Sequence, residues 1–369
     1  MPCGQASDDP KDSEHTGSPR KGGCSPASKK TTTSSCSSVR EAISAQGFLG
    51  KTGEILCASW RESTQKQYGT YLRKWEEFCS KRTYNPFHPT VISLLEFLTN
   101  LVDSGLSYSA VNTARSAISA VFLSKGDEEK IGSNPIISRF LKGVFELRTP
   151  LPRHKEIWDV DILLKHISNM PENQKLDFKS LTKKLCALLM LTTAQRVQTL
   201  HVFKLSCIKM NSAGCTIKIV DKLKHTRQGN HQDDVELAKF PDGKLCVIKC
   251  LNEYIARTKC VRKGEDLLFL CYVKPHGPAS KDTLARWLKT MLQDAGIEDY
   301  TAHSFRSVAS SAMAKAGVSL EDIMKKAGWT NARTFYKFYY RKDKPISGRV
   351  QNKDTGKNTI LKYFDNPQK

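Results

Sequence analysis

The hydrophobic positions of the chain follow a helical period from Trp60 to about residue 148. Large apolar side chains recur three and four residues apart, as on the buried face of an amphipathic helix. Thr90 and Ser107 can cap helix starts, and Pro135 fits a first helical position. The pattern predicts four helices with these inward-facing residues: Tyr68, Tyr71, Leu72, Trp75, Phe78, Val91, Leu94, Leu95, Leu98, Val111, Ala114, Ile118, Val121, Phe122, Ile137, Phe140, Leu141 and Val144. We expect the aromatic side chains among them to form core and not a surface for stacking bases.

A second pattern begins near Ile157 and mixes helices with short strands. Asp159 is placed to cap a helix, and the segment 181–191 predicts a buried one. Two β-rich segments, 215–220 and 234–238, predict a hairpin around a polar loop. Further helices are expected at about 244–259, 280–295, 303–316, 319–328 and 331–340. The expected fold class is therefore mainly α with a small antiparallel β-hairpin sheet (α+β).

The composition divides the chain further. Residues 1–54 are rich in Ser, Gly, Lys and Thr, so we expect a disordered leader that buries too little apolar surface to offset its ordering entropy. The basic stretch 149–156 is punctuated by proline, which is typical of a linker. The division that follows is a leader (1–54), a helical domain (55–148), a linker (149–156), a second domain (157–345) and a C-terminal tail (346–369).

The charge of the chain is strongly and unevenly basic. Its formal net charge is +21 and its pI is about 9.4. Residues 1–150 carry 19 Lys/Arg against 15 Asp/Glu, whereas residues 151–369 carry 39 against 22. A basic excess in a folded half indicates a polyanionic partner, most often nucleic acid, although a solvated surface has the same composition.

Membrane and metal binding are not indicated. The longest apolar run, residues 185–191, is far shorter than the ~20 residues that cross a bilayer. The N-terminus lacks an apolar signal segment, so the twelve cysteines are expected to be free thiols in a reducing compartment. Cys246 and Cys250 lie one helical turn apart without a second pair at zinc-ligand spacing, which favours small core residues over a metal site.

The residues with the clearest chemistry stand in a fixed order. Arg196 lies in Ala-Gln-Arg-Val-Gln-Thr-Leu, lysines follow in the predicted hairpin, and His303 and Arg306 form His-Ser-Phe-Arg. Trp329 follows Ala-Gly, and the string Phe-Tyr-Lys-Phe-Tyr-Tyr-Arg comes next. This order resembles the tyrosine recombinase (phage integrase) family over roughly residues 57–345. The ending looks most like recombinases of DIRS-type retroelements and related eukaryotic mobile elements.

The resemblance implies an N-terminal SAM-like core-binding domain, a catalytic domain and a role for each motif residue. Attack on a DNA phosphodiester builds negative charge on its oxygens, which Arg196 and Arg306 can hold with guanidiniums that never lose their charge. A general acid must protonate the departing 5′-oxygen, and Lys224 is expected in that role, with Lys222 as the alternative. His303 is suited to help deprotonate the nucleophile.

The nucleophile implied by the resemblance is a tyrosine near the C-terminus. Tyr339 is expected to form the 3′-phosphotyrosyl bond, with Tyr340 and then Tyr336 as the other candidates. Trp329 occupies the position of a second histidine in many relatives, and its indole N–H can donate a hydrogen bond but cannot transfer a proton. Many relatives have an acidic residue where this chain has Thr199, so an orienting carboxylate must come from elsewhere.

The partner implied is double-stranded DNA, gripped by two domains and a basic linker. Phosphate contacts are expected to dominate the affinity and make it salt-dependent. The candidate contacts are Lys222, Arg227, Lys337, Arg341 and Lys342. The resemblance further implies a homotetramer on paired DNA sites, work in the nucleus, and a reaction that needs no metal or other cofactor.

Rival functions remain open at this point. A domesticated, non-catalytic DNA-binding protein could keep the fold, although the arginines, the histidine and a suitable tyrosine are all present. A type IB topoisomerase shares the chemistry, but the helical domain and the Gly-Trp string favour a recombinase. A protein-interaction module would leave the ordered residues unexplained.

Overall fold

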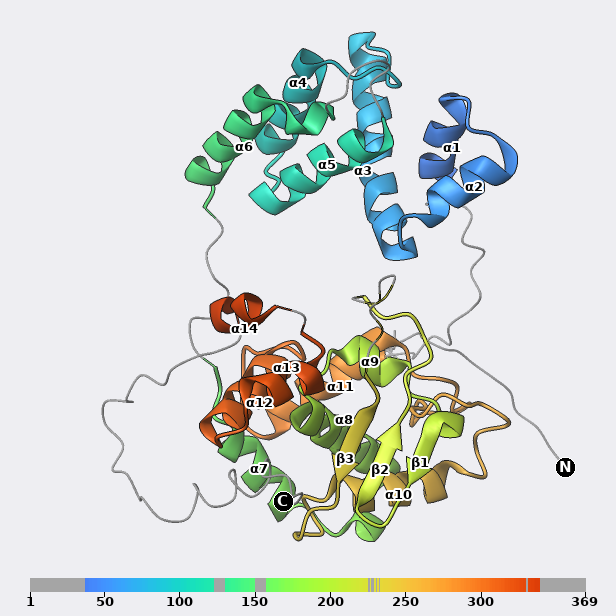
Figure 1. The fold of residues 1–369 in the computed structure, drawn as a ribbon, viewed down its shortest axis with the longest axis vertical. Helices are drawn as coiled ribbons and strands as arrows, with labels where there is room; N and C mark the ends of the chain where they lie inside the picture. The colour runs from blue at the N-terminus through green and yellow to red at the C-terminus, as the bar shows by residue number, and fades with distance from the viewer. Residues whose placement is uncertain are drawn as a thin grey trace, which may run out of the picture. The chain divides into compact units, whose positions relative to one another are not determined.

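The computed structural model describes residues 37–122, 130–149, 157–224, 226, 229, 231, 233–329 and 331–338. They belong to two compact units divided between Lys155 and Glu156, here called the helical unit and the C-terminal unit (Figure 1). The helical unit contains α1 (Ser37–Ala45), α2 (Gly50–Ala58), α3 (Glu62–Arg82), α4 (Val91–Asp103), α5 (Tyr108–Val121) and α6 (Pro135–Leu147).

The C-terminal unit combines helices with one small sheet. Its helices are α7 (Val160–Asn169), α8 (Phe178–Thr193), α9 (Val197–His201), α10 (Val247–Thr258), α11 (Lys281–Asp294), α12 (Ser304–Lys315), α13 (Leu320–Ala327) and α14 (Ala332–Phe338). Its strands are β1 (Ile208–Met210), β2 (Gly214–Ile217) and β3 (Val235–Ala238). Among the described residues, no helix is both long and apolar enough to cross a membrane.

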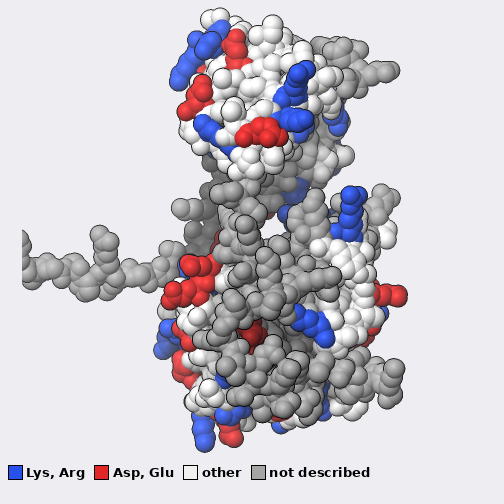
Figure 2. Space-filling model, turned by 90° about the vertical axis from the view of Figure 1, so that its left-hand side faces the viewer, with Lys and Arg blue, Asp and Glu red and all other residues white. Residues whose placement is uncertain are grey.

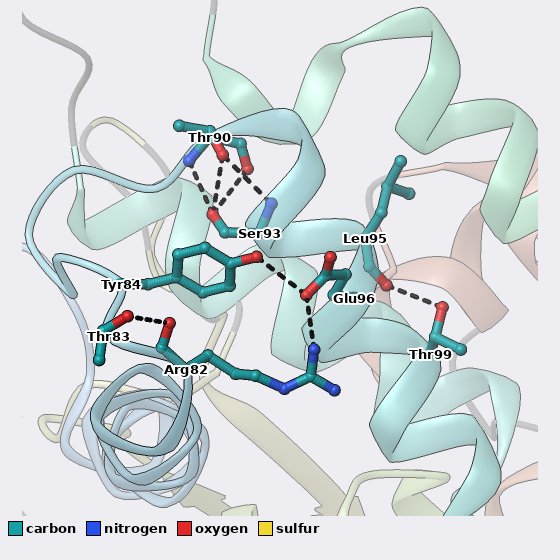
Figure 3. Close-up of polar contacts among 8 residues, drawn as sticks. All are labelled: Arg82, Thr83, Tyr84, Thr90, Ser93, Leu95, Glu96 and Thr99. Atoms are coloured by element: carbon teal, nitrogen blue, oxygen red, sulfur yellow. Dashed lines mark hydrogen bonds and ion pairs between the residues drawn. The ribbon is translucent and has the colours of Figure 1, made fainter.

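The core of the helical unit is built from the apolar positions that the periodicity selects. Leu72 and Trp75 are completely buried, and the Trp75 ring meets Phe97 edge-on with their centroids 5.3 Å apart. The aromatic residues of α3 therefore pack as core. Thr90 caps α4 as expected, because its hydroxyl accepts from the Ser93 amide while the Ser93 hydroxyl accepts from the Thr90 amide (Figure 3).

The expectation of disorder up to residue 54 is wrong for its last part. The helices α1 and α2 form there, and Val39, Ala42 and Ile43 of α1 are buried in the core of the helical unit. These three positions have helical spacing, but the Ser- and Thr-rich sequence before them hides the signal. Gln46 holds the helix in place by donating to the carbonyl of Val121 at 2.8 Å.

The sheet of the C-terminal unit is antiparallel, in the order β1-β2-β3. The predicted hairpin corresponds to β2 and β3, but β2 ends at Ile217, and β1 is a third strand of three residues, too short to show an alternating pattern. Gly214 pairs with Ala238, and a side chain there would collide with the carbonyl oxygen of Leu237. The mainly helical fold with a small antiparallel sheet is confirmed.

Helix α8 lies at the centre of the C-terminal unit. It contacts α10, α11 and α12, and Figure 1 shows these helices gathered around it. Because neighbours cover it on every side, its residues are buried almost without interruption from Leu181 to Leu191. This buried helix therefore gives firm support to the turn at its C-terminal end.

Candidate active site

Arg196 lies on the turn that joins α8 to α9. The turn is sharp because Ala194 adopts a left-handed conformation (φ 49°) at the end of α8. Arg196 itself has an extended backbone and precedes the first residue of α9, with its side chain half-buried. The end of a rigid buried helix thus sets the position of this guanidinium.

His303 and Arg306 are brought together by the first turn of α12. His303 immediately precedes the helix and keeps an exposed edge, whereas Arg306 is completely buried. Trp158 supports this turn from the start of the C-terminal unit, since its indole N–H donates to the Ser304 hydroxyl at 2.8 Å. The Trp158 ring also meets Phe305 edge-on at a centroid distance of 5.2 Å.

Arg306 is fixed by neutral groups on two sides. Its Nη1 donates to the carbonyl oxygen of Ala194 at 2.8 Å, across 112 residues of sequence. The carbon of its guanidinium lies 4.2 Å from the centre of the Trp329 ring, in a cation–π contact. Trp329 is itself buried and packs on Phe335 of α14. These contacts hold the guanidinium in one place.

The two arginines and the histidine open onto one cleft of about 540 Å³. The α8–α9 turn forms one wall and α12 another, and α11 contributes the rest of the lining. The basic side chains that line this cleft are Arg196, Lys281, Arg286, Lys289, His303 and Arg306. Asp282 is the acidic side chain among the described residues of the lining. The cleft is therefore suited to an anionic ligand.

The hairpin loop contributes Lys224 to the same environment. Leu223 is buried and anchors the loop, so that Lys222 and Lys224 on either side of it are both exposed. Partial burial is the largest cause of a lowered pKa for His303, whose ordinary value is 6.5. The positive charges of Arg306, Arg196 and Lys224 lower this pKa further. His303 is thus held largely neutral near pH 7 and can accept a proton.

The segment that contains these site residues also matches a known protein family. The model of the phage integrase family matches residues 160–345, which are half of the chain and include nearly all of the described residues of the C-terminal unit. The chain belongs to the phage integrase family. A search of curated proteins found no match.

Solved structures of recombinases share the fold at low sequence identity. A XerH site-specific recombinase bound to difH substrate before cleavage has a TM-score of 0.55 and 17% identity, over 84% of this chain and 91% of that one. The Tn1549 transposon integrase with circular intermediate DNA has a TM-score of 0.51 and 13% identity, over 84% and 96%. A lambda integrase dimer bound to a core site has a TM-score of 0.50 and 16% identity, over 86% and 80%.

The structure brings most of the predicted site residues together. Arg196, His303, Arg306 and Trp329 converge, and Lys224 is the hairpin lysine that acts on the histidine. The predicted nucleophile and several predicted DNA contacts lie outside the described residues: Tyr339, Tyr340, Arg227, Arg341 and Lys342.

Two further predicted residues lie near the end of the described chain. Tyr336 is exposed on α14 and stacks edge-on against Phe335. Lys337 follows in the same helix, but its side chain is outside what the structure describes. Neither observation selects among the three tyrosines.

Sequence reasoning missed two groups of contacts at the cleft and directly behind it. The first is the α11 cations, where Lys281 and Lys289 are eight residues apart and so lie on one side of the helix with Arg286 beside them. That spacing is visible in the sequence. The second is the buried side chain of Gln195, whose hydrogen bond to the Lys326 carbonyl only the fold reveals.

Proposed function

We propose that this chain is a site-specific DNA recombinase that cleaves and rejoins DNA strands through a 3′-phosphotyrosyl intermediate. The main support is that Arg196, His303 and Arg306 converge on one basic cleft, with Lys224 close enough to influence the histidine. A phosphodiester is the anion that suits two guanidiniums, because their N–H groups match its oxygens in pairs.

The arginines would stabilise the charge that develops during cleavage. Arg306 is buried and fixed between the Ala194 carbonyl and the Trp329 ring, so its remaining N–H groups need little reorganisation when a phosphate enters. Preorganised donors of this kind typically contribute on the order of 10² to 10³ in rate each. Arg196 would hold the phosphate from the α8–α9 side of the cleft.

The proton transfers would be divided between two groups. The tyrosine oxygen forms a bond to phosphorus, and its proton passes to His303, which its surroundings keep neutral. The bond from phosphorus to the 5′-oxygen breaks, and Lys224 supplies the proton that this oxygen takes up. Reversal of both transfers rejoins the strand, because the phosphotyrosyl bond retains the energy of the phosphodiester.

The finer parts of the proposal concern the nucleophile and the origin of the protein. Tyr339 is our first choice because the Lys-Phe-Tyr ending resembles recombinases of DIRS-type retroelements. We infer a mobile element as the source, the nucleus as the place of work and a homotetramer on paired DNA sites as the active assembly. The DNA-bound XerH and lambda integrase structures, which share this fold, support duplex DNA as the partner.

A covalent-adduct assay tests the proposal without knowledge of the target site. The full chain is incubated with a pool of nicked duplexes of randomised sequence, in which a cleaved strand loses a short 5′-hydroxyl fragment and cannot be rejoined. Denaturing electrophoresis separates protein-linked DNA, which is then sequenced. We expect an adduct that is enriched in a common sequence and is absent with Tyr339→Phe.

Each other outcome selects a rival. An adduct that survives Tyr339→Phe but disappears with Tyr340→Phe or Tyr336→Phe reassigns the nucleophile. DNA binding without an adduct for any sequence in the pool favours a non-catalytic DNA-binding protein. Adducts without sequence enrichment, together with relaxation of supercoiled plasmid and no strand exchange, favour a type IB topoisomerase.

A further inference from the structure

Two buried neutral side chains meet behind the arginines of the cleft. Gln195 is completely buried and Thr199 is 1% exposed. The Thr199 hydroxyl donates to Gln195 Oε1 at 3.1 Å, and Gln195 Nε2 donates to the carbonyl of Lys326 near the end of α13. The amide N–H of Gln195 donates to the Thr193 hydroxyl at 3.2 Å. The Gln195 side chain therefore links the Arg196 turn to a helix 131 residues away in sequence.

Further contacts lead from Lys326 back to the Arg196 turn. Helix α13 ends one residue after Lys326, and Trp329 follows two residues after that end, with its amide donating to the Met324 carbonyl at 2.9 Å. The Trp329 ring covers Arg306, and Arg306 donates to the carbonyl of Ala194, the neighbour of Gln195. One closed circuit thus joins the Arg196 turn, the end of α13, the indole and the second arginine.

We infer that Gln195 and Thr199 act as a neutral positioning pair, which sets the Arg196 turn, Arg306 and Trp329 in the arrangement that a phosphodiester requires. The inference rests on the proposed function for its substrate. The pair lies next to Arg196 in the chain, and the neighbouring Ala194 carbonyl accepts from Arg306. An amide and a hydroxyl can provide the hydrogen bonds of such an anchor without adding a negative charge that would compete with phosphate for the guanidiniums.

The donors and acceptors of a glutamine and a threonine side chain explain why these residue types can hold the Arg196 turn in place. A glutamine side chain accepts and donates at once, so it can bind the Thr199 hydroxyl and the Lys326 carbonyl together. A carboxylate at 195 could not donate to that carbonyl. A buried amide left without partners is costly, so the pair is stable only when the turn and α13 are both in place.

Four variants separate positioning from simple stability. Thr199→Val keeps the shape and removes the donated hydrogen bond, and Gln195→Met keeps the volume and removes both links. Thr199→Ser restores the hydroxyl. Thr182→Val is the matched control, because Thr182 is equally buried on α8 and its hydroxyl bonds the Phe178 carbonyl and the Tyr254 side chain, neither of which lines the cleft. Melting temperature is measured for all of them.

The first readout is single-turnover adduct formation on the enriched nicked duplex. At saturating DNA we expect Thr199→Val and Gln195→Met to be about 10- to 100-fold slower than wild type, because misplacing a reacting group by about 1 Å has effects of that size. The DNA concentration for half-saturation should change much less. Thr199→Ser should recover most of the rate, Thr182→Val should keep it, and the double variant should be no slower than the slower single variant.

The second readout needs no DNA and no catalysis. Protein labelled with 5-fluorotryptophan gives a ¹⁹F signal for Trp329, assigned with Trp329→Phe. We expect this signal to shift in Thr199→Val and Gln195→Met and to stay in Thr182→Val, because the circuit ends on that indole. If the wild type forms no adduct, the proposed function fails and the ¹⁹F signal alone decides the positioning pair.

The inference is overturned if Thr199→Val and Gln195→Met lower the melting temperature but leave both the saturated cleavage rate and the Trp329 signal at wild-type values. If Gln195→Met does not fold, Thr199→Val carries the test, since it removes one hydroxyl oxygen and preserves the shape of the side chain.

Discussion

The two units of the molecule treat their arginines in opposite ways. In the helical unit, Arg82 lies on the surface with Glu96, whose Oε2 is 3.3 Å from its Nη1 and accepts from the Tyr84 hydroxyl at 3.1 Å (Figure 3). In the C-terminal unit, Arg306 is buried against a carbonyl and an indole. Arg82 thus pairs with a carboxylate, whereas the described contacts of Arg306 are with neutral groups.

The same contrast extends to the surfaces. The face shown in Figure 2 carries Lys/Arg and Asp/Glu side chains next to one another, without a continuous patch of either sign among the described residues. The cleft of the C-terminal unit instead collects arginines and lysines from three segments far apart in sequence. The basic excess of residues 151–369 is therefore concentrated by the fold at the cleft, where it can attract an anion.

The largest effect is expected from replacing the buried arginine of the C-terminal unit, and the matching substitution in the helical unit, Arg82→Lys, should have the smallest. Arg306→Lys removes the planar fork and weakens the contact with Trp329, so we expect adduct formation to fall about 10³-fold. Single-turnover kinetics on the nicked duplex measure this. A variant that cleaves within a factor of about 3 of wild type would show that the buried guanidinium does not stabilise the reaction.

The hairpin lysines allow a matched pair in neighbouring positions. Lys224→Met should slow cleavage by about 10² to 10³ because the 5′-oxygen loses its general acid, whereas Lys222→Met should have little effect on the saturated rate. A substrate with sulfur in place of the bridging 5′-oxygen should rescue Lys224→Met, since a thiolate leaves without a proton. Rescue of Lys222→Met in its place would exchange the two assignments.

The pH dependence of cleavage probes the electrostatics of the cleft. His303 must be neutral to accept a proton, and its pKa lies below 6.5 because burial and the neighbouring cations disfavour the charged form. The rate should therefore stay level from pH 8 down to 6.5 and decline only at lower pH. Saturated rates between pH 5 and 8 test this, and an acid limb centred above 6.5 would contradict it.

The α11 cations should affect affinity more than chemistry. Lys281 and Lys289 line the cleft on one side of their helix, so each is expected to contact a DNA phosphate. Replacing either with Ala should reduce the slope of log affinity against log salt by about 1 and weaken binding to all sequences alike. Fluorescence anisotropy over a range of salt concentrations measures the slope, and an unchanged slope would remove that lysine from the interface.

The smallest effect is expected in the helical unit. Arg82→Lys keeps a positive charge near Glu96 but changes the geometry of the ion pair. Both side chains of this pair are more than one-third exposed. Such surface pairs contribute below about 1 kcal/mol, so the free energy of unfolding in urea should change by less than that. Cleavage should be unaffected, and a loss comparable to that of Arg306→Lys would erase the distinction between the units.

Local signals in the sequence were sufficient for the elements and the order of the site residues. The caps at Thr90 and Asp159 and the helix starting at Pro135 are confirmed, because hydrogen bonds within one turn depend on neighbours in sequence. The errors were also local in origin. Helix α1 was missed because a polar leader preceded its three buried residues, and β1 because it is too short for a period.

The sequence by itself determined the family of this protein, the residue types that can bind and cleave a phosphodiester, and the helices that carry them. Only the tertiary structure decided which of those residues meet at the cleft and which groups hold them there. The Arg306–Ala194 and Gln195–Lys326 hydrogen bonds join residues more than one hundred positions apart, and no periodicity or spacing encodes them. The packing of α12 against α8 and of α13 against α12 creates these contacts, because a buried polar group needs a hydrogen-bond partner, which can come from any part of the chain.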